Sequence, residues 1–229
     1  MRIAYTASSD SHTLTAPNNT TITFGPGDVV PAQPNSTGVI TWQKISGTTV
    51  DRLTFTVPMV NNVPLSYTLV GTWITNQANA PGGHSRIAVG GAPTISTDMP
   101  RSGSATYTSG VGGAALQGGS NYILTGHSSG TFSANSGTGA ITTGLTLAGT
   151  LTPTDPTVVA FGSFTGTGTI ASGGSGYSGT LGGTAANGAT ATGGFSGGFF
   201  GPQALETAFG YSLSAGSLTA VGALVGVKQ

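Results

Sequence analysis

The sequence contains no cysteine and very little charge. Of its 229 residues, six are lysine or arginine and six are aspartate or glutamate, so the formal net charge is zero. The missing cysteine excludes disulfides, thiolate catalysis and cysteine-based zinc sites. The low positive charge argues against nucleic-acid binding, which needs a basic surface to neutralise phosphates. It also argues against electrostatic docking on an anionic membrane. No nucleic-acid partner is therefore expected.

Side chains that perform acid–base catalysis are equally scarce. His12, His84 and His127 are the three histidines, and Glu206 is the single glutamate. No two carboxylates are close in sequence, and no Gly-x-Ser-x-Gly motif stands at a strand-to-helix turn. We therefore expect a protein that is not an enzyme, with no metal site of its own.

Long apolar runs are also missing. No segment approaches the ~20 apolar residues of a membrane helix, and no signal peptide is visible at the start of this chain. What is abundant is glycine, threonine and serine, a composition that also occurs in disordered chains. Here, however, Val, Ile, Thr, Phe and Tyr recur in short alternating runs, whereas disordered chains are poor in β-branched and aromatic residues. The sequence therefore predicts a folded all-β protein.

Glycine and charge are unevenly distributed along the chain. Residues 1–98 hold nine glycines and residues 99–229 hold 31. Charge follows the opposite trend, because four charged residues occur after Pro100: Arg101, Asp155, Glu206 and Lys228. We therefore predict two domains, 1–98 and 99–229.

The first domain is expected to consist of short strands of mixed polarity. Its tryptophans, Trp42 and Trp73, are the natural anchors of a small core. The predicted strands span residues 3–6, 12–16, 20–24, 39–45, 50–57 and 65–74.

The second domain shows eight more regular runs without a helical period between them. In the third of them, Ile141, Leu145, Leu147 and Leu151 share one face. Consecutive hairpins that close on themselves remove exposed edges, so we predict an eight-stranded up-and-down antiparallel β-barrel. An outer-membrane barrel would alternate similarly but needs aromatic girdles at both interfaces, so a barrel coated with Thr, Ser and Gly is favoured. The runs are 104–114, 127–135, 140–151, 159–170, 177–184, 190–200, 204–213 and 218–227.

One segment carries a specific resemblance. Residues 193–206, GGFSGGFFGPQALE, closely resemble the G-x-F-x-G-x-F-[YF]-G-P-x-A-x-E signature of transferrin-binding-protein-B-like barrels. Residues 99–107, MPRSGSATY, look like the opening of that barrel, and residues 67–73, YTLVGTW, are similar to a motif that precedes it. The resemblance spans nearly the whole chain in the right order.

This resemblance implies a small N-terminal β "handle" domain followed by the barrel. It also implies a bacterial surface or secreted protein, from a group that includes transferrin-binding lipoproteins and haem-capturing hemophilin-like proteins. The sequence departs from the family in lacking a lipobox cysteine and in having few lysines and arginines, so neither a lipid-anchored form nor transferrin is expected. The residues matching the family's structural motif include Gly198, Phe199, Phe200, Gly201, Pro202 and Glu206.

Three residues are considered as ligand contacts. His84 follows a Gly- and Pro-containing loop in the handle domain, and a histidine there could ligate haem iron, as the hemophilin-like resemblance implies. Trp73 lies in the same domain and is a second candidate. Glu206 could contact a ligand, but a carboxylate that accepts backbone N–H bonds to fix its loop is the favoured interpretation.

Together these features predict a non-catalytic binding protein at the cell surface or secreted, acting in iron or haem acquisition. Its partners would be a protein or haem ligand and an outer-membrane receptor, and haem is the candidate cofactor. The alternative is a structural or adhesive subunit that assembles with copies of itself, because near-zero net charge favours self-association.

Overall fold

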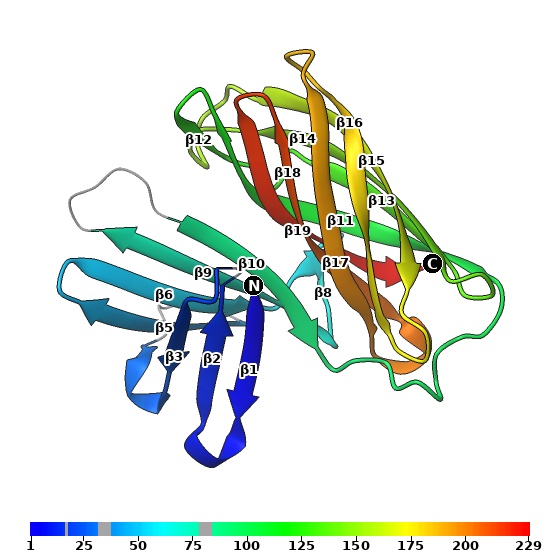
Figure 1. Cartoon of the computed structure of the whole chain (residues 1–229), viewed down its shortest axis with the longest axis horizontal. Coiled ribbons are helices and arrows are strands. Elements are labelled where there is room, and N and C mark those ends of the chain that lie inside the picture. The colour runs from blue at the N-terminus through cyan, green and yellow to red at the C-terminus, as the bar shows by residue number, and fades with distance from the viewer. Residues whose placement is uncertain (17, 32–37, 78–83) are drawn as a thin grey trace. The chain divides into compact units, whose positions relative to one another are not determined.

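The computed structural model describes residues 1–16, 18–31, 38–77 and 84–229. Almost all of the regular structure is β-strand (Figure 1), which confirms the all-β class. Contacts along the chain divide it into two compact units. The first comprises Met1–Val57 and Leu69–Ala88, and the second comprises Pro58–Thr68 and Val89–Gln229.

The first unit is built mainly from two antiparallel sheets. One has three strands in sequence order, and the other has the order β10-β9-β6-β5-β4. The 3-10 helices η1 (Ala7–Ser9) and η2 (Pro26–Asp28) interrupt the chain between strands. The strands are β1 (Arg2–Thr6), β2 (Ser11–Thr15), β3 (Thr21–Phe24), β4 (Val29–Val30), β5 (Val39–Ser46), β6 (Thr49–Thr56), β9 (Thr68–Gln77) and β10 (His84–Gly91).

Both tryptophans lie in the core of this unit, as predicted. Trp42, Leu53 and Trp73 face one another across three neighbouring strands, and all three side chains are buried. Leu14 and Phe24 of the three-stranded sheet belong to the same cluster. The two sheets therefore bury their apolar faces against each other, which is how small β domains form a core.

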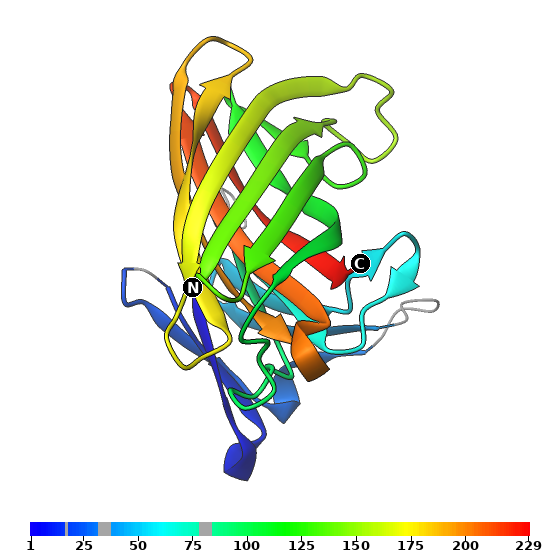
Figure 2. The same cartoon turned by 90° about the vertical axis from the view of Figure 1, so that its right-hand side faces the viewer.

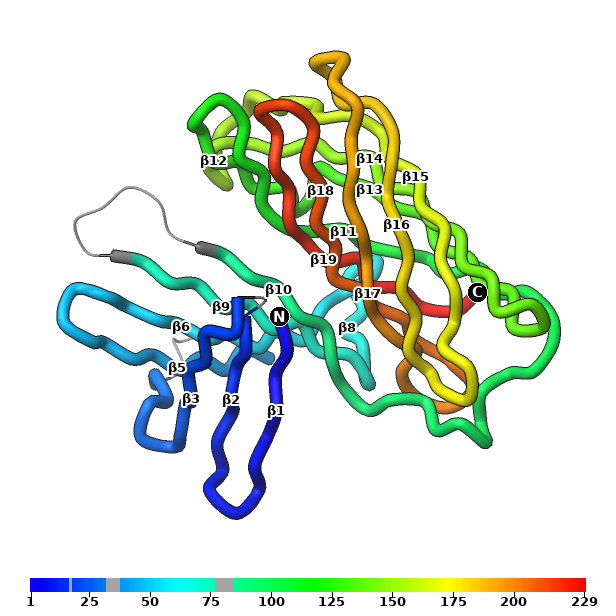
Figure 3. The backbone as a smooth tube through the Cα atoms, in the orientation of Figure 1, coloured from blue at the N-terminus to red at the C-terminus, as the bar shows by residue number. Residues whose placement is uncertain are grey.

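The second unit contains the predicted barrel, whose eight strands β11 and β13–β19 follow one another around the sheet (Figures 2 and 3). Pairing of β11 with β19 closes it, so these strands leave no open edge. The short strand β12 (Ser120–Ile123) is an addition that pairs with the end of β11. The barrel strands are β11 (Ser104–Gln117), β13 (Ser129–Asn135), β14 (Ala140–Gly149), β15 (Val159–Ile170), β16 (Gly176–Ala185), β17 (Thr190–Phe200), β18 (Glu206–Ala215) and β19 (Leu218–Lys228).

One strand differs from the predicted alternation. Leu151 was expected on the buried face of β14, but its side chain is 49% exposed, whereas Thr150 is 1% exposed. The reason is that β14 ends at Gly149, up to which the alternation holds, and the next residue, Thr150, forms an isolated bridge with Ile123.

The unit that contains the barrel also includes segments that the composition break assigns to the first domain. Residues 58–68 carry the hairpin β7 (Met59–Val60) and β8 (Val63–Pro64), joined by a turn with Asn61 and Asn62 at positive φ. Residues 89–98 also belong to this unit, and the Thr94 hydroxyl donates a hydrogen bond to Gly201 O at 2.6 Å. The physical division thus differs from a single boundary at residue 98, because composition does not report these contacts.

Candidate functional site

The inside of the barrel is a packed aromatic core. The rings of Phe132, Tyr177 and Phe209 lie 5.2 to 6.5 Å apart, and these side chains are at most 4% exposed. The Tyr177 hydroxyl is 2.6 Å from Thr207 Oγ1, and the Tyr107 hydroxyl donates to Ala204 O at 2.8 Å. Burial raises the pKa of both tyrosines well above the ordinary value. These groups therefore fill the barrel and stabilise it, as expected for eight strands.

Glu206, at the start of β18, is a buried carboxylate with three hydrogen-bond donors. Its two oxygens accept hydrogen bonds from the backbone N–H groups of Ser66 and Tyr67, at 2.7 and 3.0 Å, and from the Thr68 hydroxyl, at 2.8 Å. The side chain is 3% exposed. A buried carboxylate is stable only when hydrogen-bonded in this way. The geometry is that of a structural clamp on residues 66–68.

The remaining motif residues surround this clamp. Phe199 lies in the aromatic core and Phe200 pairs with Pro93 in an isolated bridge. Gly201 has φ +72°, and a Cβ there would lie 2.5 Å from the Tyr67 ring. The Thr207 hydroxyl donates to the carbonyl of Gly198 at 3.3 Å. Pro202 begins the 3-10 helix η3 (Pro202–Ala204).

In the first unit, Trp73 is 2% exposed and its indole N–H donates to Asp51 Oδ1 at 2.8 Å. The Arg86 guanidinium lies 4.5 Å from the centre of the Trp73 ring, a cation–π distance. The Thr75 hydroxyl donates to the same Asp51 oxygen at 2.7 Å. Trp73 is therefore held in a defined position in the core, and its role in ligand binding stays a prediction.

The structure places His84 differently from the expected loop. Residues 78–83 of that loop lie outside the described part of the chain, and His84 is the first residue of β10. Its side chain also lies outside the described part. His127 is exposed in the turn before β13. A haem-binding role of His84 stays a prediction.

The third histidine, His12, has an aromatic environment that the sequence did not reveal. Its ring centre lies 5.1 Å from that of Tyr5, 4.8 Å from that of Trp42 and 5.2 Å from that of Phe55. Desolvation lowers the pKa of His12, and the nearby Asp10 carboxylate opposes part of that shift. The neutral imidazole is therefore the form that this unit favours.

Acidification is expected to destabilise the first unit through His12. Because the folded-state pKa lies below the unfolded value of about 6.5, the unfolded chain takes up the proton first. The contribution of the neutral His12 to the free energy of unfolding is fully present above the unfolded-state pKa, and it is lost as the pH falls through the folded-state pKa. We expect the urea concentration at the unfolding midpoint, followed by tryptophan fluorescence, to decrease when the pH is lowered from about 7.5 to about 5. His12→Phe, which keeps a ring but cannot titrate, should flatten this trend, and an unchanged trend would show that His12 is not its source.

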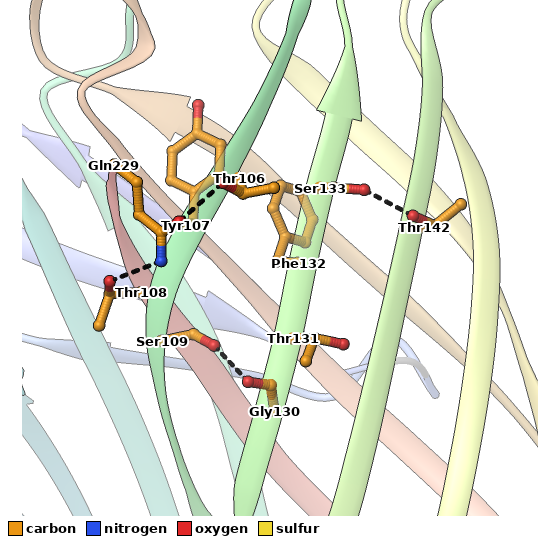
Figure 4. A pocket seen from close by; sticks show the side chains of 10 residues that line it. All are labelled: Thr106, Tyr107, Thr108, Ser109, Gly130, Thr131, Phe132, Ser133, Thr142 and Gln229. Atoms are coloured by element: carbon orange, nitrogen blue, oxygen red, sulfur yellow. Dashed lines mark hydrogen bonds between the residues drawn. The ribbon is translucent and has the colours of Figure 1, made fainter.

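The second unit carries a pocket of about 420 Å³ beside β11, β13 and β14 (Figure 4). Gln229 holds its edge, since the side-chain amide accepts from the Thr106 hydroxyl at 2.8 Å and donates to the Thr108 hydroxyl at 3.0 Å. Ser133 and Thr142 are hydrogen-bonded to each other at 2.6 Å. The lining residues are Thr106, Tyr107, Thr108, Ser109, Gly130, Thr131, Phe132, Ser133, Thr142 and Gln229.

Sequence reasoning did not find this pocket. It predicted a barrel coated with hydroxyl-bearing side chains, and exposed residues such as Thr142 and Thr167 fit that description. The sequence feature related to this pocket is the occurrence of Thr and Ser at alternate positions of the barrel strands. That signal locates an outer face but not a hollow in it.

The fold is similar to that of known bacterial proteins. A lobe of transferrin-binding protein B from Haemophilus parasuis Hp5 superposes with a TM-score of 0.58 and 17% identity, over 96% of this chain and 44% of that one. The chain has the fold of a transferrin-binding protein B lobe. The motif resemblance predicted this fold, and the structure confirms it.

Two further solved structures support the same assignment. Intact Ap-TbpB gives a TM-score of 0.56 and 16% identity over 96% of this chain and 45% of that one. Isotype 1 transferrin-binding protein B from serogroup B Neisseria meningitidis gives 0.55 and 16% over 91% and 38%. The chain thus spans less than half the length of these transferrin-binding proteins B. No family model matches the sequence, and no curated protein matches it significantly.

Two further properties complete the description of the lobe. Within the part of the chain that the structure describes, no three His, Asp or Glu side chains are grouped closely enough to hold a metal ion. No helix among the described residues is both long and apolar enough to cross a membrane.

Proposed function

We propose that this chain is a non-catalytic binding protein of the bacterial surface or exterior, acting in iron or haem acquisition. The observation that carries the proposal is the structural match of nearly the whole chain to parts of transferrin-binding proteins B. The scarcity of acid–base side chains supports a binding role over catalysis. The partners we propose are a haem or protein ligand and an outer-membrane receptor.

The packed barrel favours ligand binding elsewhere than in its interior. Phe161, Phe164 and Phe209 are each at most 1% exposed within it. Binding proteins of this kind use side chains that a rigid scaffold presents at its surface. For haem, the candidate ligand to the iron is His84, since a histidine imidazole is the commonest axial ligand of haem iron.

Haemin binding is expected to depend on His84. Mixing the purified chain with micromolar haemin should shift and sharpen the Soret absorbance band, because imidazole ligation changes the electronic state of the iron. His84→Ala should abolish that shift. His127→Ala is the matched control, since His127 is an exposed histidine of the other unit, and it should bind haemin as the parent does.

Two results would contradict this assignment. The absence of any Soret shift with the parent chain at micromolar haemin would remove haem as a ligand. An equal Soret shift in the parent and in His84→Ala would show that another residue ligates the iron.

A further inference from the structure

The pocket beside β11, β13 and β14 exists because one strand pairing of the barrel ends early. β11 and β13 are paired from Ser104↔Asn135 to Tyr107↔Phe132, and the pairing stops there although both strands continue. Two positions further on in the same register, the Ser109 hydroxyl donates to Gly130 O at 2.7 Å. A side chain thus bridges the two strands beyond the end of their backbone pairing, and the hollow lies between them there.

The exposed and half-buried side chains around this hollow are neutral hydrogen-bonding groups. Across the strands, Thr106 faces Ser133, Ser133 faces Thr142, and Thr142 faces Thr167. Neighbouring strands are about 4.8 Å apart, so these hydroxyls form a closely spaced row. A hydroxyl has one donor and two acceptor positions, and the hydrogen bond between Ser133 and Thr142 leaves acceptor positions on both. The row can therefore both hold its own geometry and bind a polar ligand.

The charge of this part of the barrel restricts what it can bind. Between Arg101 and Glu206 the sequence has one charged residue, Asp155. Asp155 lies in the loop between β14 and β15 and does not line the pocket. Lys228, the neighbour of Gln229, donates to Gln203 O at 3.3 Å and does not line the pocket either, so the lining side chains offer no counter-charge to phosphates, carboxylates or cations. The remaining class is a neutral molecule rich in hydroxyl groups.

We propose that this pocket binds a neutral hexose oligosaccharide. Sugar hydroxyls donate and accept hydrogen bonds, which matches the hydroxyls of Thr106, Ser133 and Thr142 and the amide of Gln229. The volume of about 420 Å³ falls in the range of small-molecule sites. The lining combines hydroxyl groups with the apolar carbons of the same side chains, and Tyr107 and Phe132 are buried, so we expect an affinity in the millimolar range. This site lies outside the first unit, so it goes beyond the haem proposal and does not depend on it.

The test is a titration of the isotope-labelled full chain followed by amide NMR spectra. Cellotetraose, maltotetraose and chitotetraose are each added to about 10 mM, with glycerol at matched hydroxyl concentration as the non-specific reference. At least one tetrasaccharide should shift the amides of Thr106, Ser133 and Thr142 in a saturable way, and glycerol should not. If none of the three does so, the proposal is wrong, whatever the outcome of the haemin experiment.

Two variants distinguish binding in the pocket from non-specific binding to the hydroxyl-rich outer face of the barrel. Ser133→Ala combined with Thr142→Val removes two hydroxyls and should weaken the affinity about tenfold. Thr167→Val is the matched control, because Thr167 lies next in the same row, is exposed and does not line the pocket, and it should change the affinity less than about twofold. The amide spectrum also reports whether each variant is folded. Equal weakening by both changes would contradict a site in the pocket.

Discussion

Gly197→Ala is expected to reduce the stability of the barrel by about 3 kcal/mol or more. Gly197 lies in β17 directly opposite Phe209 of β18. A Cβ at this position would lie 1.9 Å from Ala208 O and 2.5 Å from the Cα of Phe209. These are backbone atoms of the paired strand, so no rotamer change can relieve the contact. The two strands would have to separate, at the cost of their hydrogen bonds and of the packing of Phe209.

A second glycine provides the matched control for this prediction. Gly182 lies in β16, and the single atom within 4 Å of a Cβ placed there is Ala191 O, at 3.9 Å. Gly182→Ala should therefore leave the free energy of unfolding within about 1 kcal/mol of the parent, and the expected direction is a small gain, because glycine weakens a strand. Urea unfolding followed by far-ultraviolet circular dichroism measures both. Equal midpoints for the two variants would contradict the close approach of β17 and β18.

The same contact explains the spacing of the family motif in physical terms. Along β17, Gly193 and Gly197 alternate with Phe195 and Phe199, and these phenylalanines belong to the barrel core. Each glycine leaves room for a large side chain of β18, since Gly193 faces Leu213 and Gly197 faces Phe209. Alternating small and large residues fill the interior of a narrow barrel. The high glycine content of the second unit is therefore partly a packing requirement.

The barrel was the part of the fold that the sequence predicted best. Its strands are long, and their two-residue alternation does not depend on which strand pairs with which. The errors occur where the hydrophobic pattern of a segment does not report how its strand ends or pairs. Leu151 was misplaced because β14 ends at Gly149 and Thr150 then bridges Ile123, which a hydrophobic pattern does not show. The two-residue strands of the β7–β8 hairpin are too short to show any period.

The candidate site was less accessible to sequence reasoning, because it depends on contacts between distant residues. The pocket arises where β11 and β13 stop pairing after Tyr107, and neither strand's composition changes there. The role of Glu206 as an acceptor of backbone hydrogen bonds was the favoured interpretation, but its donors could not be named. They lie about 140 positions earlier in the chain, at Ser66 and Tyr67. Only the folded topology brings them together.

Glu206→Ala is expected to reduce the stability of the barrel unit by about 3 kcal/mol or more. The change leaves the N–H groups of Ser66 and Tyr67 and the hydroxyl of Thr68 without their acceptor in a buried environment. Each unpaired buried donor costs about 1–3 kcal/mol, and water that enters the new cavity can recover part of that cost. Residues 66–68 should therefore be released before the barrel strands unfold, since they depend on this one side chain.

Hydrogen exchange at individual amides is the measurement that separates this local effect from a general loss of stability. In Glu206→Ala the Ser66 and Tyr67 amides should exchange much faster, while amides of β14 and β15 should change only by the global loss. In Glu206→Gln the exchange rates of these amides should lie between those of the parent and the alanine variant. The glutamine side chain keeps one acceptor oxygen, but its NH₂ group is a donor and would face another donor. Asp155→Ala is the control: Asp155 also accepts a backbone N–H bond, from Thr157, but in an exposed loop, so it should cost less than about 1 kcal/mol. Unchanged exchange at Ser66 and Tyr67 in the alanine variant would show that Glu206 does not hold this segment.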